Sequence, residues 1–158
     1  MDDQEKSSLR EVAFREWAEN TRNGYAELGE FIVEFSQLEF TIRVSIGRAI
    51  NLQDHLINVV LSLYDFSSLC RVWKQVMLDE HPNYADRVES IFKKCMYLND
   101  NRVYVAHGLW SPSNVGIEAV HVSRNSSKSH LHFSDPEELK TLAIECQNLL
   151  QEVLIFPE

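Results

Sequence analysis

The strongest constraint on the fold is a run of apolar residues that recur every three or four positions between residues 28 and 49. They are Leu28, Ile32, Phe35, Ile42, Ile46 and Ala49, flanked by Phe31 and Leu38. This spacing places them on one face of an α-helix, so the sequence predicts a long central helix with a buried stripe. Glu39 interrupts that stripe, and a buried carboxylate is costly unless a partner satisfies it.

Other helical segments are expected before and after this central helix. A first helix over residues 7–20 should end at Asn23-Gly24, because glycine and asparagine commonly follow a helix. The apolar residues 56–77 should form two helical pieces, the second of them capped near Asp65 or Ser67. Proline at position 82 should then stop the chain.

The second half of the chain mixes helix and strand. A helix is expected over residues 84–106, and the last helix should begin with a capping box made by Ser134 and Glu137. Between these two helices, the composition of residues 111–114 predicts a turn, and alternating β-branched residues predict a hairpin insert at about 115–133. The sequence therefore predicts a mainly α fold, an up-and-down bundle of about five to six helices with one small β-hairpin before the C-terminal helix.

Size and composition favour one domain over residues 1–158, because 44% of the residues are hydrophobic and can fill one core. The formal net charge of -9 argues against a protein that coats nucleic acid non-specifically, although a local basic cleft stays open. The beginning of the chain lacks a secretory pattern and no apolar run is long enough to span a membrane, so a cytoplasmic protein is expected. Three cysteines without metal-ligand spacing should be reduced thiols: Cys70, Cys95 and Cys146.

The helix expected over residues 84–106 changes character at its end. Its apolar stripe starts with Val88, Ile91, Phe92 and Cys95, and the same phase continues onto Asn99, Arg102, Val103 and Ala106. The inward face therefore turns polar shortly before His107. An arginine binds phosphate through two parallel hydrogen bonds, and histidine exchanges protons near neutral pH, so Arg102 and His107 suit phosphodiester cleavage.

An arginine followed five positions later by a histidine, at the end of a long helix in an acidic helical domain, resembles the HEPN superfamily. The ending Ala106-His107-Gly108 is similar to that of many members. The resemblance implies a metal-independent endoribonuclease without a cofactor, acting as a homodimer in a toxin or antiviral-defence setting. RNA would be the substrate, and an antitoxin or defence protein would be the partner.

The resemblance also implies a role for each residue of the motif. Arg102 would stabilise charge on the phosphorane, and His107 would act as general base or acid, leaving a 2′,3′-cyclic phosphate. Members usually carry asparagine or aspartate directly after the arginine, where this chain has Val103. The supporting polar groups expected beside the pair are Asn99, Asn101 and Tyr104.

The residues also predict one contact without the family. Glu39 and Arg102 are each the polar residue in an apolar helical stripe, so two packed helices would place them together as an ion pair. That pair would either orient Arg102 toward a cleft or serve only as a buried structural contact.

Further alternatives stay open at this point. One alternative is a catalytically inactive HEPN-like module for dimerisation or partner binding, and another is an unrelated helical bundle. His130 and His132 share a strand face at a spacing that zinc accepts, but no third ligand is evident, so no metal is expected.

Trp110 would either stack a base or hold the hairpin against the helices, and the second role is favoured.

Overall fold

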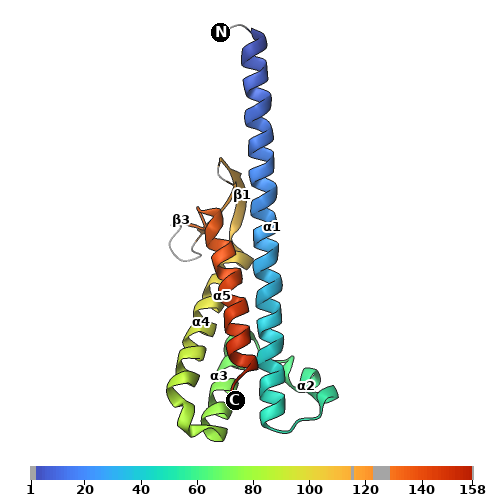
Figure 1. Ribbon diagram of the computed structural model, residues 1–158, viewed down its shortest axis with the longest axis vertical. Coiled ribbons are helices and arrows are strands. Elements are labelled where there is room, and N and C mark those ends of the chain that lie inside the picture. The colour runs from blue at the N-terminus through green and yellow to red at the C-terminus, as the bar shows by residue number, and fades with distance from the viewer. Residues whose placement is uncertain (1–2, 115, 123–128, 158) are drawn as a thin grey trace.

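The computed structural model describes residues 3–114, 116–122 and 129–157, and its fold is mainly α, as the sequence predicts. The helices are α1 (Asp3–Ala49), α2 (Asp54–Leu61), α3 (Phe66–Glu80), α4 (Ala85–His107) and α5 (Pro136–Leu154), with the 3-10 helix η1 (Pro82–Tyr84) before α4. The strands β1 (Leu109–Ser113), β2 (Gly116–Val122) and β3 (Ser129–His132) lie between α4 and α5 in sequence. Figure 1 shows α1 as the longest element, with the other helices gathered beside its C-terminal part.

Residues 3–49 form one helix rather than the two helices that the sequence predicts. Gly24, the predicted end, is buried, and a Cβ atom there would lie 2.8 Å from Cγ1 of Ile117 in β2. Gly24 therefore lets the strand approach the helix and does not terminate it. A glycine inside a helix costs only about 1 kcal/mol relative to alanine, which the surrounding helix can sustain.

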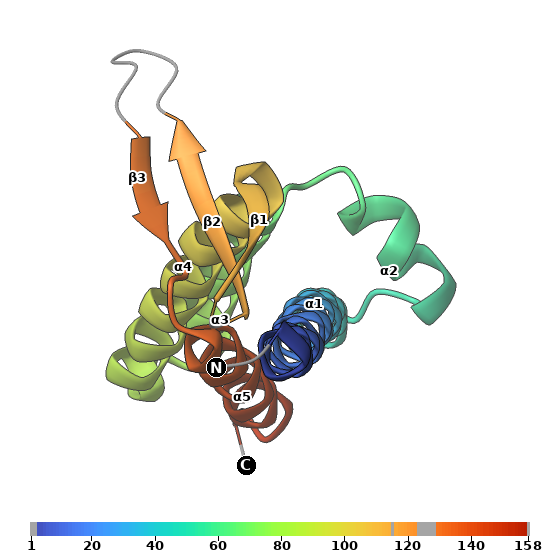
Figure 2. The same cartoon turned by 90° about the horizontal axis from the view of Figure 1, so that it is seen from above.

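The buried face of α1 packs mainly against α5 and α3. Phe31, Leu38 and Ile42 have no exposed area, whereas Ile32 is 38% exposed. The prediction that Ile32 belongs to the buried stripe is wrong, because Ile32 lies about 100° around the helix from Phe31. Figure 2, which looks down on the molecule, shows α5 beside α1, with α2 on the opposite flank of α1 from α3 and α4.

The predicted hairpin is part of a three-stranded antiparallel sheet with the order β1-β2-β3. Its β2–β3 pair is confirmed, with Val120 opposite Leu131. The turn predicted at residues 111–114 is wrong, because residues 109–113 form the edge strand β1. Proline lacks the N–H needed by an inner strand and is tolerated at a sheet edge, which is where Pro112 lies. The central strand β2 contacts α1, so the sheet rests on the long helix.

Two helix starts depend on aspartate side chains. The Asp65 carboxylate accepts a hydrogen bond from the Ser68 backbone N–H at 2.8 Å, which confirms the predicted cap of α3. At the start of α5 the cap is Asp135, whose carboxylate accepts from the Glu137 backbone N–H at 3.0 Å. The predicted capping box from Ser134 is therefore wrong by one residue.

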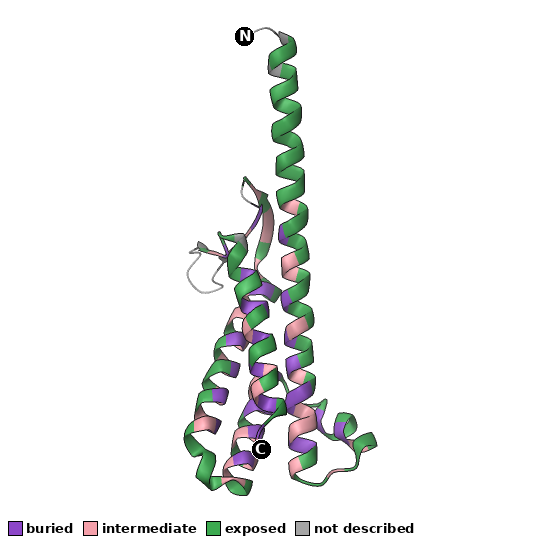
Figure 3. Ribbon diagram, viewed as in Figure 1, coloured by how far each residue is buried: buried purple, intermediate pink, exposed green. Residues whose placement is uncertain are grey.

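The first part of α1 extends beyond the rest of the molecule. Every described side chain between residues 4 and 23 is exposed except that of Thr21, which is half-buried. Figure 3 shows this segment, called the arm below, as a stretch of exposed helix. Within the described residues, no helix combines the length and the apolar character that crossing a membrane requires.

Candidate functional site

Arg102 lies on the exposed surface of α4, close to its C-terminal end. The carbon of its guanidinium lies 5.9 Å from the centre of the Phe35 ring in α1, which is a cation–π arrangement. Within the described residues, no carboxylate forms an ion pair with Arg102. The ring thus supports the guanidinium from one side, while its N–H donors remain accessible to an anion such as phosphate.

The predicted ion pair between Glu39 and Arg102 is wrong. The Glu39 carboxylate pairs with Arg43, one turn further along the same helix. Arg102 meets α1 at Phe35, one turn before Glu39. Hydrophobic periodicity tells which face of each helix points inward, but it does not tell how far one helix is shifted along the other. The two helices do approach each other, and the predicted level of contact is one turn away from the observed one.

His107 is the last residue of α4, and its side chain is exposed. Between Arg102 and His107 a helix turns by about 140° and rises by about 7.5 Å. Because α4 continues without a break to His107, the two side chains leave different sides of the helix. Neither of them lines a well-defined cavity of the described residues. The backbone positions of Arg102 and His107 therefore do not share one face of α4.

The three supporting residues take local roles in the structure. The Asn101 side-chain amide donates to the Tyr97 carbonyl at 2.9 Å, within α4 itself. The Tyr104 ring stacks on His132 of β3, with ring centres 4.1 Å apart. Asn99 is half-buried one turn before Val103. Among the described residues, neither asparagine hydrogen-bonds to Arg102 or His107, so the amides do not build a polar cluster around the motif.

Three basic residues on this helix or beside it are used in contacts between helices. Lys74 of α3 pairs with Glu89 of α4 at 2.5 Å, and Lys94 of α4 pairs with Glu152 of α5 at 2.5 Å. The Arg87 guanidinium lies over the Phe156 ring at 5.2 Å. These residues fasten α4 to its neighbours, which leaves Arg102 as the cation of this helix that combines an exposed position with an aromatic support.

Trp110 holds the sheet against α4, which is the role the sequence favours for it. Its indole N–H donates to the Val105 carbonyl at 2.9 Å, and its ring stacks on Phe133 with centres 5.6 Å apart. The side chains of His121 and His130 lie outside the described residues. Within the described part of the chain, no group of three or more His, Cys, Asp and Glu side chains is placed to hold a metal ion.

The three cysteines are free and buried. Contact with the Cys95 thiol, followed by burial, raises the pKa of Cys70 above its ordinary value. Burial raises the pKa of Cys146 to about 12. Since the thiolate is the reactive form, Cys70 and Cys146 are chemically quiet.

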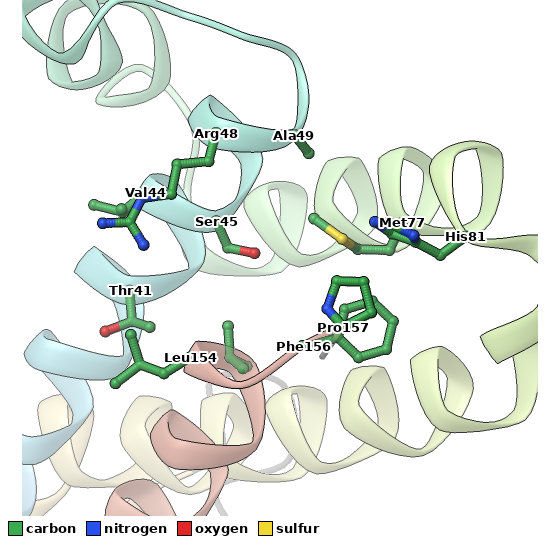
Figure 4. Close-up of a pocket in the computed structure, with 11 residues that line it drawn as sticks. Thr41, Val44, Ser45, Arg48, Ala49, Met77, His81, Leu154, Phe156 and Pro157 are labelled. Carbon is green, nitrogen blue, oxygen red and sulfur yellow. The ribbon is translucent and has the colours of Figure 1, made fainter.

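A cavity of about 230 Å³ lies between the C-terminal end of α1, the end of α3 and the segment after α5. Figure 4 shows its polar groups apart from one another, since the Arg48 side chain extends beside Val44 while His81 lies on the other side. Met77 and Phe156 line the space between them. In the sequence, His81 signals only the end of a helix, and the structure adds no convergent set of polar groups that would define a ligand.

No protein-family model matches the chain, and neither a curated protein nor a solved structure matches it.

Proposed function

We propose that the exposed end of α4 is a metal-independent ribonuclease site of the HEPN type, which two copies of the chain complete. The observation that carries the proposal is Arg102, whose guanidinium lies over Phe35, is exposed, and pairs with no carboxylate among the described residues. A positive charge supported in this way is suited to a phosphate that approaches from outside the molecule.

The divergence of Arg102 and His107 on α4 supports a site shared by two copies. In a homodimer the two motifs face each other, so a phosphate bound by Arg102 of one copy meets His107 of the other. His107 takes the proton of the ribose 2′-hydroxyl, and the oxygen attacks the adjacent phosphorus. Arg102 stabilises the charge that develops on the phosphorane, and the protonated His107 returns its proton to the 5′-oxygen, which leaves as a hydroxyl group. The expected product is a 2′,3′-cyclic phosphate.

Incubation of the protein with RNA in excess EDTA tests this proposal. We expect cleavage with cyclic phosphate ends by the wild type, and a loss of about 10²–10⁴-fold in rate in Arg102→Ala and in His107→Ala. Arg71→Ala, which removes an exposed arginine of α3, is the matched control and should cleave normally. Absence of cleavage by folded wild-type protein, or equal activity in all four proteins, would contradict the proposal.

A second function, partner binding without catalysis, is favoured by the apolar residues beside the motif. Val103 is 37% exposed and Leu109 is 71% exposed, on either side of His107. Exposed apolar groups at a helix end fit a protein contact better than an RNA contact. Val103→Asn separates the two functions: it restores the polar residue usual in the family, so a nuclease should cleave faster, whereas a protein-binding end should lose affinity for its partner.

A further inference from the structure

The arm has an apolar face that is continuous with the core. Ala13 precedes the buried Phe31 by five full helical turns, so both point the same way from α1. Leu9 and Trp17 lie one turn on either side of Ala13, and they are 55% and 38% exposed. Figure 1 shows α1 running on past the sheet and α5, which cover this face lower down. The arm thus repeats the pattern of a packed helix at a place where the described residues supply no helix to pack on it.

A solitary helix of this length is only marginally stable in water, because most helical stability in proteins comes from packing of the apolar face. A second helix is the element that would cover a narrow apolar stripe of this kind. The question is which molecule provides it.

The charges of the arm point to a second copy of the same arm. The whole chain has a net charge of -9, whereas residues 4–23 contain equal numbers of acidic and basic residues. Two arms therefore do not repel each other, unlike most other surfaces of two such chains. The acidic residues are Glu5, Glu11, Glu16 and Glu19, and the basic residues are Lys6, Arg10, Arg15 and Arg22.

The order of residues around Ala13 selects an antiparallel arrangement. When Ala13 of one copy faces Ala13 of the other, Leu9 lies at the level of Trp17 of the second copy, and Arg10 at the level of Glu16. Apolar residues then meet apolar residues, and a base meets an acid. A parallel pair would set each arginine and each glutamate opposite its own counterpart, which is unfavourable. The small side chain at the centre allows the two helices to approach closely.

We infer that the arm is a self-association element, in which the arms of two chains pair as antiparallel helices centred on Ala13. This inference does not depend on the ribonuclease proposal. Arg102 lies beside Phe35, which is 22 residues from Ala13, so roughly 33 Å of helix separates Arg102 from the centre of the arm pair. Arm pairing is thus an interface separate from a shared site at the end of α4.

Sedimentation of the full chain over a wide concentration range tests the pairing. We expect reversible self-association through the arm, whose dissociation constant rises about tenfold or more in Ala13→Arg, because a charge at the centre faces its own copy. Ala18→Arg is the matched control: it is also an exposed alanine of the arm, but it lies about 140° around the helix, and it should leave the dissociation constant unchanged.

Disulfide trapping tests the direction of the pair, and the buried native cysteines leave introduced thiols as the reactive ones. A mixture of Leu9→Cys and Trp17→Cys chains should form a crosslink between the two variants in preference to crosslinks within either. A wild type that stays monomeric at every concentration would overturn the inference. So would equal weakening by Ala13→Arg and Ala18→Arg, or a preference of Leu9→Cys for itself. None of these changes touches Arg102 or His107, so RNA cleavage reports on the other proposal separately.

Discussion

Gly24 divides α1 into an arm and a body that share one helix and one apolar phase but differ in what covers them. In the body, Phe31 and Leu38 are completely enclosed by α3, α5 and the sheet. In the arm, Leu9 and Trp17 occupy the same face and remain in contact with solvent. Helical periodicity is therefore sufficient to place apolar side chains on one face of a helix. Burial of that face depends on another segment that packs against it, which the local pattern does not specify.

Hydrogen exchange should show the largest difference between the two regions. Backbone amides of the body open only with the fold as a whole, whereas those of the arm open when one isolated helix frays. At low protein concentration we expect amides around Ala13 to exchange roughly a thousandfold or more faster than those around Leu38. Residue-resolved exchange followed by NMR measures this, and equal protection in both regions would mean that the arm is covered within a single chain.

The next largest difference between the arm and the body is expected when one phenylalanine in each region is truncated to alanine. Phe31 is fully buried and Phe14 is 66% exposed. Phe31→Ala should lower the free energy of unfolding by about 3–5 kcal/mol, because it removes apolar contacts and leaves a cavity. Phe14→Ala should change it by less than about 0.5 kcal/mol. Urea unfolding of both variants measures the two losses of unfolding free energy. Losses of similar size would contradict the prediction.

Adding one methyl group at two glycines of α1 should give effects of opposite sign. A Cβ at Gly47 would lie 2.6 Å from Cγ1 of Ile57 in α2, whereas a Cβ at Gly29 meets nothing within 4 Å. Crowding of a packed contact costs about 1–3 kcal/mol, which exceeds the roughly 1 kcal/mol that alanine gains over glycine in a helix. Gly47→Ala should therefore lower the thermal midpoint, and Gly29→Ala should raise it. The same sign for both would refute this account of the two glycines.

Replacement of Glu27, which lies at the start of the body, should give the smallest effect on stability. This effect should depend on pH. Burial, followed by the nearby Glu137 carboxylate, raises the pKa of Glu27 above its ordinary 4.5, although Lys140 lowers it in part. A carboxyl whose pKa is raised by folding binds its proton better in the folded state, so it disfavours folding once pH exceeds the folded pKa. Glu27→Gln should thus stabilise the chain slightly at pH 7 and give no gain below pH 4.5. Thermal unfolding at the two pH values checks this; a gain at low pH alone would reverse the sign.

The sequence predicts the helices well where several independent signals agree. The α3 start, for instance, combines a capping aspartate with the apolar spacing that follows it. It misses β1, because Pro112 and its serine neighbours have the composition of a turn, and only the pairing with β2 makes the segment a strand. It also splits α1 at Gly24, since the contact with Ile117 is distant in sequence and cannot be read locally.

The candidate site was predicted in its residues but not in its contacts. The prediction that Arg102 continues the buried stripe of α4 is wrong, because the stripe passes through Leu98 and Val105 and leaves Arg102 exposed. Its contact with α1 was expected, one turn away from where it occurs. The pairing of Glu39 with Arg43 was accessible from the sequence, because residues four apart on a helix are neighbours. Whether Arg102 and His107 act together stays a prediction, because it depends on a second copy of the chain.

The tryptophans of this chain report on three separate places. Trp17 is partly exposed on the arm, Trp73 is fully enclosed with its indole N–H donating to Ser45 at 3.0 Å, and Trp110 stacks at the junction of α4 and the sheet. The emission wavelength of an indole ring shifts with the polarity around it, so the three tryptophans should differ in emission wavelength as well as in location. Variants that keep a single tryptophan would therefore turn one optical signal into separate records of arm association, core melting and sheet docking.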